Sequence, residues 1–310
     1  MNMFNQIKGA LFGVAVGDAL GAVTEFMSQD EVNANYGYLT EMTGGGWLGI
    51  EPGETTDDTA MTIAVAKGLL ANPSDPVGRI GNEFKKWVET NPRDIGNIIR
   101  TTFDCYEGDW FKAAEKAHKV LSGRSAGNGS LMRCLPVALA YGDLKKIEEI
   151  TVLQSKMTHY DDLASEACLI YNRIAYRVLK GESLKSSIEE EIKETRYCDA
   201  IKEYPDVSPN GYVVNTFIWV LNILWTSSSF EESVQKAANL GGDSDTIGAI
   251  AGGLAGLYRG FASIPKRYVE VLKPKDELET LSEKLWQVRE NETASGSSES
   301  NYTTPGSKQY

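Results

Sequence analysis

Two apolar segments, one early and one late in the chain, carry a glycine at every fourth position. The rows are Gly9, Gly13, Gly17 and Gly21, and Gly248, Gly252, Gly256 and Gly260. A spacing of four keeps each row on one face of an α-helix, although each helical glycine is unfavourable by roughly 1 kcal/mol relative to alanine. Four in one helix make sense where another backbone must come close. We therefore predict two central, closely packed helices whose ends lead into the functional site. The alternative is a pair of loosely specified helices of small residues.

Helical periodicity dominates the rest of the sequence, and convincing alternating strand patterns are absent. The segments Ser28–Glu31 and Ser229–Glu232 are typical of capping boxes at helix starts. Because 42% of the 310 residues are hydrophobic, the chain can bury a large core without an external staple. We predict one all-α domain over residues 1–290, followed by residues 291–310 with the composition of a disordered tail.

Composition also limits which binding partners and which cellular compartment we expect for this chain. The formal net charge is −12, and an acidic surface repels phosphate backbones, so direct nucleic-acid binding is not expected. The stretches Ala10–Val23 and Thr246–Ile264 contain Asp18 and Arg259 and lack about 20 clean apolar residues, so we interpret them as buried helices and expect no membrane span. Four cysteines without a CxxC pair are typical of reduced thiols, and we expect a cytoplasmic monomer.

The first cluster of residues with chemical potential is Pro52–Thr59, which opens the apolar segment Ala60–Leu70. Asp57 and Asp58 are adjacent there, and hydroxyl side chains flank them. A helix start offsets part of their mutual repulsion through its dipole. A divalent cation such as Mg²⁺ or Mn²⁺ offsets far more, because hard cations bind oxygen ligands. Taken alone, the segment is equally consistent with an over-capped helix start.

The second cluster is Asn239–Thr246, which opens the late glycine-bearing helix. Asp243 and Asp245 lie two residues apart, and Thr246 adds a hydroxyl. The preceding pair Gly241–Gly242 permits unusual backbone angles and leaves room for a ligand; a capped helix start is again the alternative. If the two clusters converge, five or six oxygen ligands surround a space for two metal ions, which can clamp vicinal hydroxyls and activate a water. With only two histidines in the chain, a zinc site is disfavoured.

The segment Gly123–Arg133 is a glycine-rich loop that runs into an apolar stretch. Such a loop exposes backbone N–H groups to an anion, and Arg133 could add charge, although an ordinary turn between helices fits equally well. Among single residues, Glu25 could act as acid or base over the metals, His159 could bond a ligand hydroxyl or phosphate, and Tyr212 could stack on an adenine. The structural alternatives are a solvated helix end for Glu25 and a capping role for His159.

Six motifs, which lie in this order across residues 5–262 and include the clusters described above, together resemble the ADP-ribosylglycohydrolase family of the dinitrogenase-reductase-activating type. The motifs are Gly13–Gly21, Gly53–Thr59, Arg93–Gly96, Gly127–Arg133, Thr158–Asp161 and Leu240–Thr246. Each is weak alone, but their common order is hard to explain otherwise. One departure is Thr55, which stands where many relatives carry an aromatic residue and which leaves the ligand residues intact.

The resemblance implies a compact, orthogonal, all-α multi-helix bundle with a central cleft for two divalent cations, Mg²⁺ or Mn²⁺. By position, the residues that match the metal ligands are Thr56, Asp57, Asp58, Asp243, Asp245 and Thr246. The resemblance also implies three catalytic carboxylates, those of Glu25, Asp94 and Asp58. Gly127, Asn128, Gly129 and Ser130 match the pyrophosphate-binding loop and His159 a ligand-contacting histidine; together with Gly241, Gly242 and Tyr212 they form the expected substrate-binding set.

The implied function is metal-dependent hydrolysis of the N-glycosidic bond of an ADP-ribosylated group, on a protein or a small molecule. Asp94 matches an acid of members that act on ADP-ribosyl-arginine, so arginine linkage is expected. The alternatives are hydrolysis of O-linked, serine-type ADP-ribose and a non-catalytic ADP-ribose-binding protein. The intact acid clusters speak against the latter, because a protein without turnover has no reason to keep repelling carboxylates. A metal phosphohydrolase would share the metals without needing Asp94.

Overall fold

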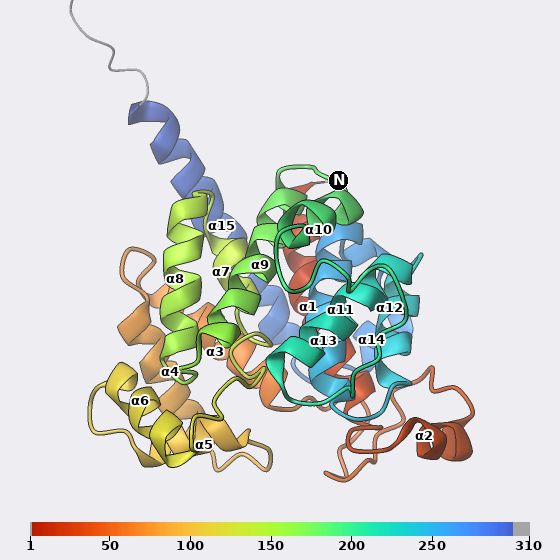
Figure 1. Ribbon diagram of the computed structural model, residues 1–310. Helices are drawn as coiled ribbons and strands as arrows, with labels where there is room; N and C mark the ends of the chain where they lie inside the picture. Colours follow the sequence, from red (N-terminus) through yellow and green to blue (C-terminus); the bar gives the residue numbers. More distant parts are fainter. Residues whose placement is uncertain (1, 300–310) are drawn as a thin grey trace, which may run out of the picture.

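The computed structural model describes residues 2–299 (Figure 1). Within them the chain forms fifteen α-helices and no β-strand, which confirms the all-α prediction. In chain order the helices are α1 (Met3–Gly21), α2 (Gln29–Tyr36), α3 (Asp57–Ala71), α4 (Val77–Glu89), α5 (Asn97–Asp104), α6 (Trp110–Val120), α7 (Leu135–Ala140), α8 (Leu144–Lys156), α9 (Asp162–Leu179), α10 (Leu184–Ile192), α11 (Val213–Thr226), α12 (Phe230–Ala238), α13 (Ser244–Arg259), α14 (Lys266–Val271) and α15 (Lys275–Glu299). A short 3₁₀ helix, Phe261–Ser263, links α13 to α14.

Helices α1 and α13 lie side by side through the middle of the molecule and run in opposite directions (Figure 1). A Cβ atom added at Gly13 would lie 2.1 Å from the carbonyl oxygen of Gly252, and one at Gly17 would lie 1.9 Å from that of Gly248. No side chain fits such gaps, so the predicted close packing of the glycine rows is confirmed. One detail differs: Gly260 follows the end of α13 as its cap, with a φ of 79°.

The antiparallel pairing brings the end of α1 to the start of α13. A Cβ at Gly21 would lie 2.2 Å from the carbonyl oxygen of Ser244. The start of α3 joins them, because Asp18 of α1 accepts hydrogen bonds from the backbone N–H groups of Thr56 at 3.1 Å and Thr59 at 3.0 Å. Three helix ends therefore meet at one place in the interior.

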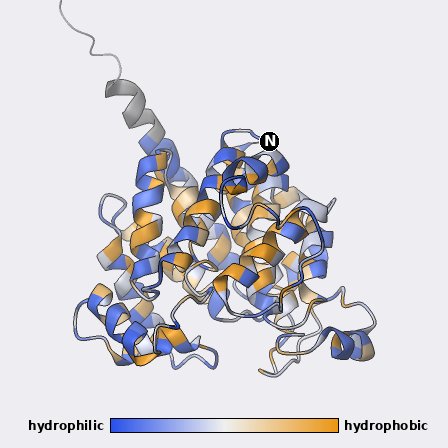
Figure 2. Ribbon diagram, in the orientation of Figure 1, coloured by the Kyte–Doolittle hydropathy of each residue, from blue (hydrophilic) through white to orange (hydrophobic). Residues whose placement is uncertain are grey.

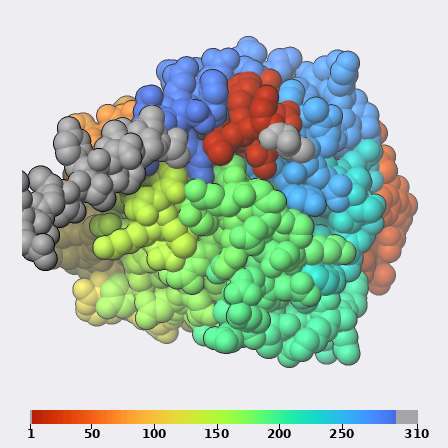
Figure 3. All heavy atoms as spheres, turned by 90° about the horizontal axis from the view of Figure 1, so that it is seen from above, coloured from red at the N-terminus to blue at the C-terminus, as the bar shows by residue number. Residues whose placement is uncertain are grey.

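The other helices cover this central pair. Helices α11 and α12 pack against α13, α9 packs against α7, α8 and α13, and α15 lies along α1, α3 and α7. Hydrophobic residues concentrate in the inner helices, whereas α2 is largely hydrophilic (Figure 2), and Val32 is its one buried residue. From above, the N-terminal segment, in red, lies against the blue C-terminal segments (Figure 3).

Helix α15 continues to Glu299, past the boundary at residue 290 that composition predicted. Residues 300–310, the rest of the expected disordered tail, lie outside the described residues. No helix among the residues that the structure describes is both long and apolar enough to cross a membrane.

The two predicted capping boxes have different outcomes. At α2 the box is complete, because the Ser28 hydroxyl accepts from the Glu31 N–H and the Glu31 carboxylate accepts from the Ser28 N–H. At α12 the Ser229 hydroxyl accepts from the Glu232 N–H, but the Glu232 carboxylate accepts from the N–H of Ser228, one residue earlier. The second box is therefore only half formed.

Candidate functional site

The candidate site begins where α3 and α13 start side by side. Thr56 caps the start of α3, with Asp57 and Asp58 in its first turn, and Asp243 caps the start of α13. The Thr246 hydroxyl donates to Oδ2 of Asp58 at 3.1 Å, across 188 residues of sequence. The two acid–hydroxyl clusters therefore face each other.

The carboxylates at these helix starts have no countercharge. No ion pair of the described chain includes Asp57, Asp58, Asp243 or Asp245. Burial, and then the neighbouring carboxylates, raise the pKa values of Asp57, Asp58 and Asp245 well above their usual range. Burial also raises the pKa of Asp243 to about 6. Without a cation, this cluster therefore favours protonated carboxyl groups.

The environment of Asp58 fits a divalent cation. Its Oδ2 accepts from the hydroxyls of Thr56 and Thr246, but its Oδ1 is buried without any hydrogen-bond partner. A buried carboxylate oxygen left unpaired is costly, and a bound cation would remove that cost. The surrounding donors are all carboxylate and hydroxyl oxygens, the set that Mg²⁺ and Mn²⁺ prefer.

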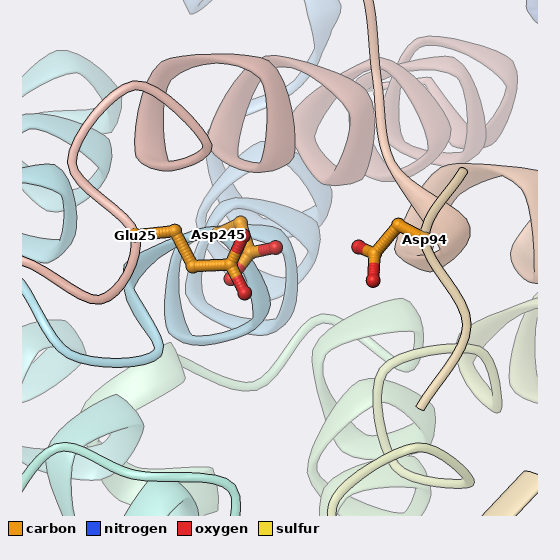
Figure 4. A group of neighbouring side chains, drawn as sticks. All are labelled: Glu25, Asp94 and Asp245. Carbon is orange, nitrogen blue, oxygen red and sulfur yellow. The ribbon is translucent and has the colours of Figure 1, made fainter. Parts of the chain in front are cut away.

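Two further carboxylates lie against this cluster. One carboxylate oxygen from each of Glu25, Asp94 and Asp245 lies within 4.8 Å of the others. In Figure 4 the side chains of Glu25 and Asp245 lie together, and that of Asp94 points toward them. Burial raises the pKa of Glu25 to about 8, despite the hydrogen bond that Trp47 Nε1 donates to it at 2.5 Å. Burial also raises the pKa of Asp94, so either group can hold a proton closer to neutral pH than an exposed carboxyl can.

All of these carboxylates except that of Asp58 line a cavity of about 520 Å³, a size suited to a small ligand. Its acidic lining residues are Glu25, Asp57, Asp94, Asp243 and Asp245. Polar groups line it as well, from His159, Arg124, Gly127 and Gly129, and from Asn128, whose two amide hydrogens are already donated to Thr216 and Asp243. The Asn128 side-chain amide also donates to the Asp243 carboxylate, which ties the glycine-rich loop to the acid cluster.

The predicted substrate-binding residues fall into two groups. Gly127, Asn128, Gly129 and His159 line the cavity, whereas Ser130, Gly241, Gly242 and Tyr212 do not. The Ser130 hydroxyl is buried and pairs with the Ser155 hydroxyl at 2.8 Å. The Tyr212 side chain is exposed, and the residue reaches the loop through a backbone bridge to Gly127.

The prediction for the glycine pair before Asp243 is confirmed in its backbone angles and wrong in its purpose of making room for a ligand. Gly241 and Gly242 have φ angles of 67° and 62°. A Cβ would lie 2.2 Å from the Met27 carbonyl oxygen at the first position and 1.9 Å from the Pro209 carbonyl oxygen at the second. The positive φ angles and the neighbouring backbone, rather than room for a ligand, therefore require glycine here.

Three features of the site were not predicted. Asp18 is fully buried at the centre and accepts three hydrogen bonds, from the N–H groups of Thr56 and Thr59 and from the Thr59 hydroxyl. An aspartate inside an apolar, glycine-bearing helix is the signal that could have identified it. The exposed rings of Phe26 and Trp47, which line the cavity, have no such signal in the sequence. Arg133, expected to add charge to the loop, is instead buried in the core and does not line the cavity.

Comparisons with known proteins agree with this geometry. The profile of the family described as ADP-ribosylglycohydrolase matches residues 1–295. The chain is 37% identical over 280 residues to the ADP-ribosyl-(dinitrogen reductase) glycohydrolase of Rhodospirillum rubrum, covering 90% of this chain and 94% of that protein. It is 26% identical to the ADP-ribosylarginine hydrolase Tri1 of Serratia proteamaculans, covering 93% and 81%.

A solved structure described as an ADP-ribosylglycohydrolase-related protein complex has the same fold. Its TM-score is 0.79 at 30% sequence identity, and the match covers 92% of this chain and 98% of the other. The family match therefore spans both glycine-bearing helices and every residue of the cavity, and the chain belongs to the ADP-ribosylglycohydrolase family.

Proposed function

We propose that this protein hydrolyses the N-glycosidic bond between ADP-ribose and an arginine side chain, and that it uses two divalent cations, Mg²⁺ or Mn²⁺. The observation that carries the proposal is the meeting of the α3 and α13 starts around an unpaired, buried oxygen of Asp58. The names of two relatives, one acting on ADP-ribosylated dinitrogen reductase and one on ADP-ribosylarginine, support the reaction class.

The residues that would hold the cations belong to the two helix starts: Thr56, Asp57, Asp58, Asp243, Asp245 and Thr246. When bound, the ions supply positive charge that orients ribose hydroxyls and lowers the pKa of a coordinated water. Asp18 supports this set without lining the cavity, because it holds the N–H groups that begin α3.

The chain's own groups have three tasks in the reaction. The backbone of Gly127 and Gly129 and the ring of His159 hold the diphosphate, so that binding energy far from the reacting carbon aligns it. The carboxylates around the cavity favour the positive charge that develops at C1″ of the distal ribose as its bond to nitrogen breaks. Glu25, whose pKa is about 8, can give its proton to the departing nitrogen as the C1″–N bond breaks. The water oxygen bonds to C1″, and the Glu25 carboxylate formed in this way takes the proton that the water loses.

Two aromatic rings beside the acids favour a cationic leaving group. Phe26 and Trp47 are 66% and 51% exposed, with ring centroids 5.2 Å apart. Phe26 has a φ of 63°, which is rare for a bulky residue; the backbone hydrogen bond from its N–H to the Gly242 carbonyl holds it. A guanidinium is attracted both to ring faces and to the carboxylates of Glu25 and Asp94.

Arg93 ties the two loops at this side of the cavity together. Its guanidinium donates to the Leu48 carbonyl oxygen at 3.2 Å and pairs with the Glu54 carboxylate. Both partners belong to the loop that carries Trp47, and Asp94 follows Arg93 directly. The ring of Trp47 and the Asp94 carboxylate are thereby held on linked segments, which supports arginine as the linked residue.

Incubation with an ADP-ribosyl-arginine peptide and Mg²⁺ or Mn²⁺ tests the proposed function. We expect release of intact ADP-ribose, measured by chromatography, and loss of that release in EDTA. A serine-linked peptide of the same sequence measures the linkage preference, and faster turnover of it would contradict the arginine assignment. Binding of ADP-ribose without turnover of either peptide, or release of inorganic phosphate, would reject the proposed reaction.

Replacing Trp47 tests the contribution of the rings. We expect Trp47→Leu to lower kcat/KM for the arginine-linked peptide by roughly tenfold, because a partly desolvated cation–π contact is worth about 1–2 kcal/mol, and to leave the affinity for free ADP-ribose unchanged. Trp47→Phe keeps a ring but loses the hydrogen bond to Glu25, so it should retain most of the activity. Equal losses in the two variants would assign the effect to the hydrogen bond and reject the ring contact.

A further inference from the structure

Arg133 carries a buried charge that the reaction described above does not use. Its side chain is fully buried, and among the described residues it forms no ion pair with a carboxylate. The guanidinium lies 4.4 Å from the centroid of the Phe84 ring and donates only to uncharged groups: Oε1 and the carbonyl oxygen of Gln154, the sulfur of Met61, and the Thr158 hydroxyl. A buried charge without a paired countercharge is costly. We therefore looked to the groups that Arg133 contacts for the reason that this charge is kept.

One chain of hydrogen bonds that starts at Arg133 ends at His159. Arg133 Nη2 donates to Oγ1 of Thr158 at 2.8 Å, and the same Oγ1 lies 2.8 Å from Nδ1 of His159. Arginine can only donate, so the Thr158 oxygen accepts from it. The Thr158 hydroxyl proton has no other acceptor within hydrogen-bond range in the described chain, so it points to His159 Nδ1. That nitrogen is therefore the acceptor, and the ring proton is on Nε2.

The Nε2 of His159 faces the cavity without a protein partner among the described residues. His159 is 1% exposed, yet it lines the cavity, and its Nε2 lies beside the bare α-carbons of Gly127 and Gly129. A Cβ at those positions would come within 3.4 Å and 3.3 Å of this nitrogen. Burial, and then the Arg133 charge, lower the pKa of His159 well below its usual value, so the ring is a neutral donor.

A second chain of hydrogen bonds from Arg133 holds the glycine-rich loop. Because Arg133 Nε donates to Oε1 of Gln154 at 3.1 Å, the Gln154 amide must present its NH₂ group on the other side. That NH₂ donates to the Ser130 carbonyl oxygen at 3.2 Å. A single guanidinium thus orients both the histidine that lines the cavity and the Ser130 end of the glycine-rich loop.

We propose that Arg133 is a positioning residue which, through Thr158 and Gln154, presents the His159 Nε2–H to the diphosphate of the substrate and holds the Gly127–Ser130 loop, of which Gly127 and Gly129 line the cavity, beside it. The inference rests on the proposed function for the identity of the ligand. Arg133 itself does not touch the ligand. The Arg133 guanidinium donates to the groups that orient His159 and the loop, and these in turn would donate to the anionic diphosphate. This gives a reason for keeping an unpaired cation in the core.

The tautomer of His159 can be measured directly by ¹⁵N NMR of the full-length protein. The chain has only two histidines, so a His118→Gln variant assigns their resonances. We expect His159 Nδ1 to resonate as a bare nitrogen and Nε2 to carry the proton in the ligand-free protein. A proton on Nδ1 would overturn the proposal.

Thr158 variants test the relay, because replacing Arg133 itself risks unfolding the core. We expect Thr158→Val to lose the fixed tautomer and to weaken binding of ADP-ribose by roughly tenfold or more, the effect of losing a hydrogen bond to a charged acceptor. Thr158→Ser keeps the hydroxyl and should restore both. Mn²⁺ affinity should be equal in all three proteins, since the metal-ligand candidates are elsewhere.

Calorimetry with ADP, which keeps the diphosphate but lacks the distal ribose, and with adenosine, which lacks both, identifies the group that His159 contacts. The Thr158→Val loss should be the same for ADP as for ADP-ribose and absent for adenosine. A loss confined to ADP-ribose would place the Nε2–H on the distal ribose, an equal loss for adenosine would place it on the nucleoside, and either would contradict the diphosphate assignment. An unchanged affinity for ADP and ADP-ribose would reject the relay. Neither NMR nor calorimetry requires turnover, so these outcomes are separate from failure of the proposed hydrolysis.

Discussion

The side chain of Asp58 shows how single residues of this site depend on something that the polypeptide does not supply. One of its oxygens accepts two hydroxyl hydrogen bonds, and the other is buried and unpaired. The charged form of Asp57 is also disfavoured, because burial and the nearby Asp94 raise its pKa. Residues that would hold cations are thus a source of instability when no cation is bound.

Alanine at Asp57 or Asp243 removes a proposed ligand. We expect hydrolysis to fall at least about a thousandfold, because metal ions supply several kcal/mol of charge stabilisation and about 1.4 kcal/mol is tenfold in rate. The fold should survive, since either change also removes like-charge repulsion. ADP-ribose release and thermal unfolding in EDTA are the measurements. Asp75→Ala, at an exposed position, is the matched control, and normal turnover in either site variant would contradict the ligand assignment.

Asp18 is a residue whose contribution is to position others. Alanine there leaves the N–H groups of Thr56 and Thr59 and the Thr59 hydroxyl without their acceptor. Because an unsatisfied buried donor costs about 1–3 kcal/mol, we expect Asp18→Ala to lower the free energy of unfolding by roughly 3 kcal/mol, measured in urea. Mn²⁺ affinity should fall as well, because α3 loses the anchor of its first turn. Asp18→Asn keeps one acceptor oxygen and should be intermediate; wild-type values in Asp18→Ala would show that the anchor is dispensable.

At the scale of elements, the contact between α1 and α13 determines where the site can form. The two helices meet backbone to backbone, so the end of one and the start of the other cannot move apart independently. Helix α3 is attached at the same end through Asp18. The ligand-bearing starts of α3 and α13 are therefore both held by α1, an element that offers no proposed metal ligand of its own.

Because these helices approach so closely, we predict that one added methyl group between them destabilises the protein. A Cβ at Gly17 would lie 1.9 Å from a backbone oxygen, so Gly17→Ala must push α1 and α13 apart. We expect a loss of roughly 3 kcal/mol or more in the free energy of unfolding, together with weaker Mn²⁺ binding. The control is Gly78→Ala in α4, where a Cβ meets nothing within 4 Å; it should gain up to about 1 kcal/mol from helix propensity. Equal stabilities of the two variants would contradict the packing.

At the scale of the whole molecule, the buried acids couple stability to pH and to metal. Burial raises the pKa values of Asp18 and Asp243 to about 6 and that of Glu25 to about 8. These values exceed the ordinary ones of 3.8 and 4.5, so the folded protein binds protons more tightly than the unfolded chain. The stability that this adds is complete at low pH and is lost as the pH rises through the folded pKa values.

In EDTA we therefore expect the free energy of unfolding to fall as the pH rises from about 4.5 to about 8, because of these raised pKa values. Excess Mg²⁺ or Mn²⁺ should reverse the trend, since cations compete with protons for the same oxygens. Glu25→Gln should flatten the upper part of the profile in EDTA, because it removes a group whose pKa is raised to about 8. Thermal melts across pH measure the three profiles, which are those of the wild type in EDTA, the wild type with metal, and Glu25→Gln in EDTA. A flat profile in EDTA would show that the acids are not buried together.

Much of this protein could be predicted locally. Helical periodicity, glycines spaced by four and adjacent acids with hydroxyls are short-range patterns, and each was found on the predicted kind of element. What failed also has a physical reason. Gly241 and Gly242 are glycines because Met27 and Pro209 approach them, and Arg133 turns into the core because Gln154 and Thr158 accept its hydrogen bonds. No local pattern contains those distant partners.

The sequence by itself determined which faces of α1 and α13 could touch and which residues carry oxygen ligands, because side-chain type and helical spacing are properties of a few consecutive residues. Only the tertiary structure decided that Thr246 would meet Asp58, that Glu25 and Asp94 would face the same cavity, and that Trp47 would reach Glu25. Those contacts join segments separated by tens to hundreds of residues. Their existence depends on how the whole set of helices packs, which is a balance of burial and steric fit that no single segment encodes.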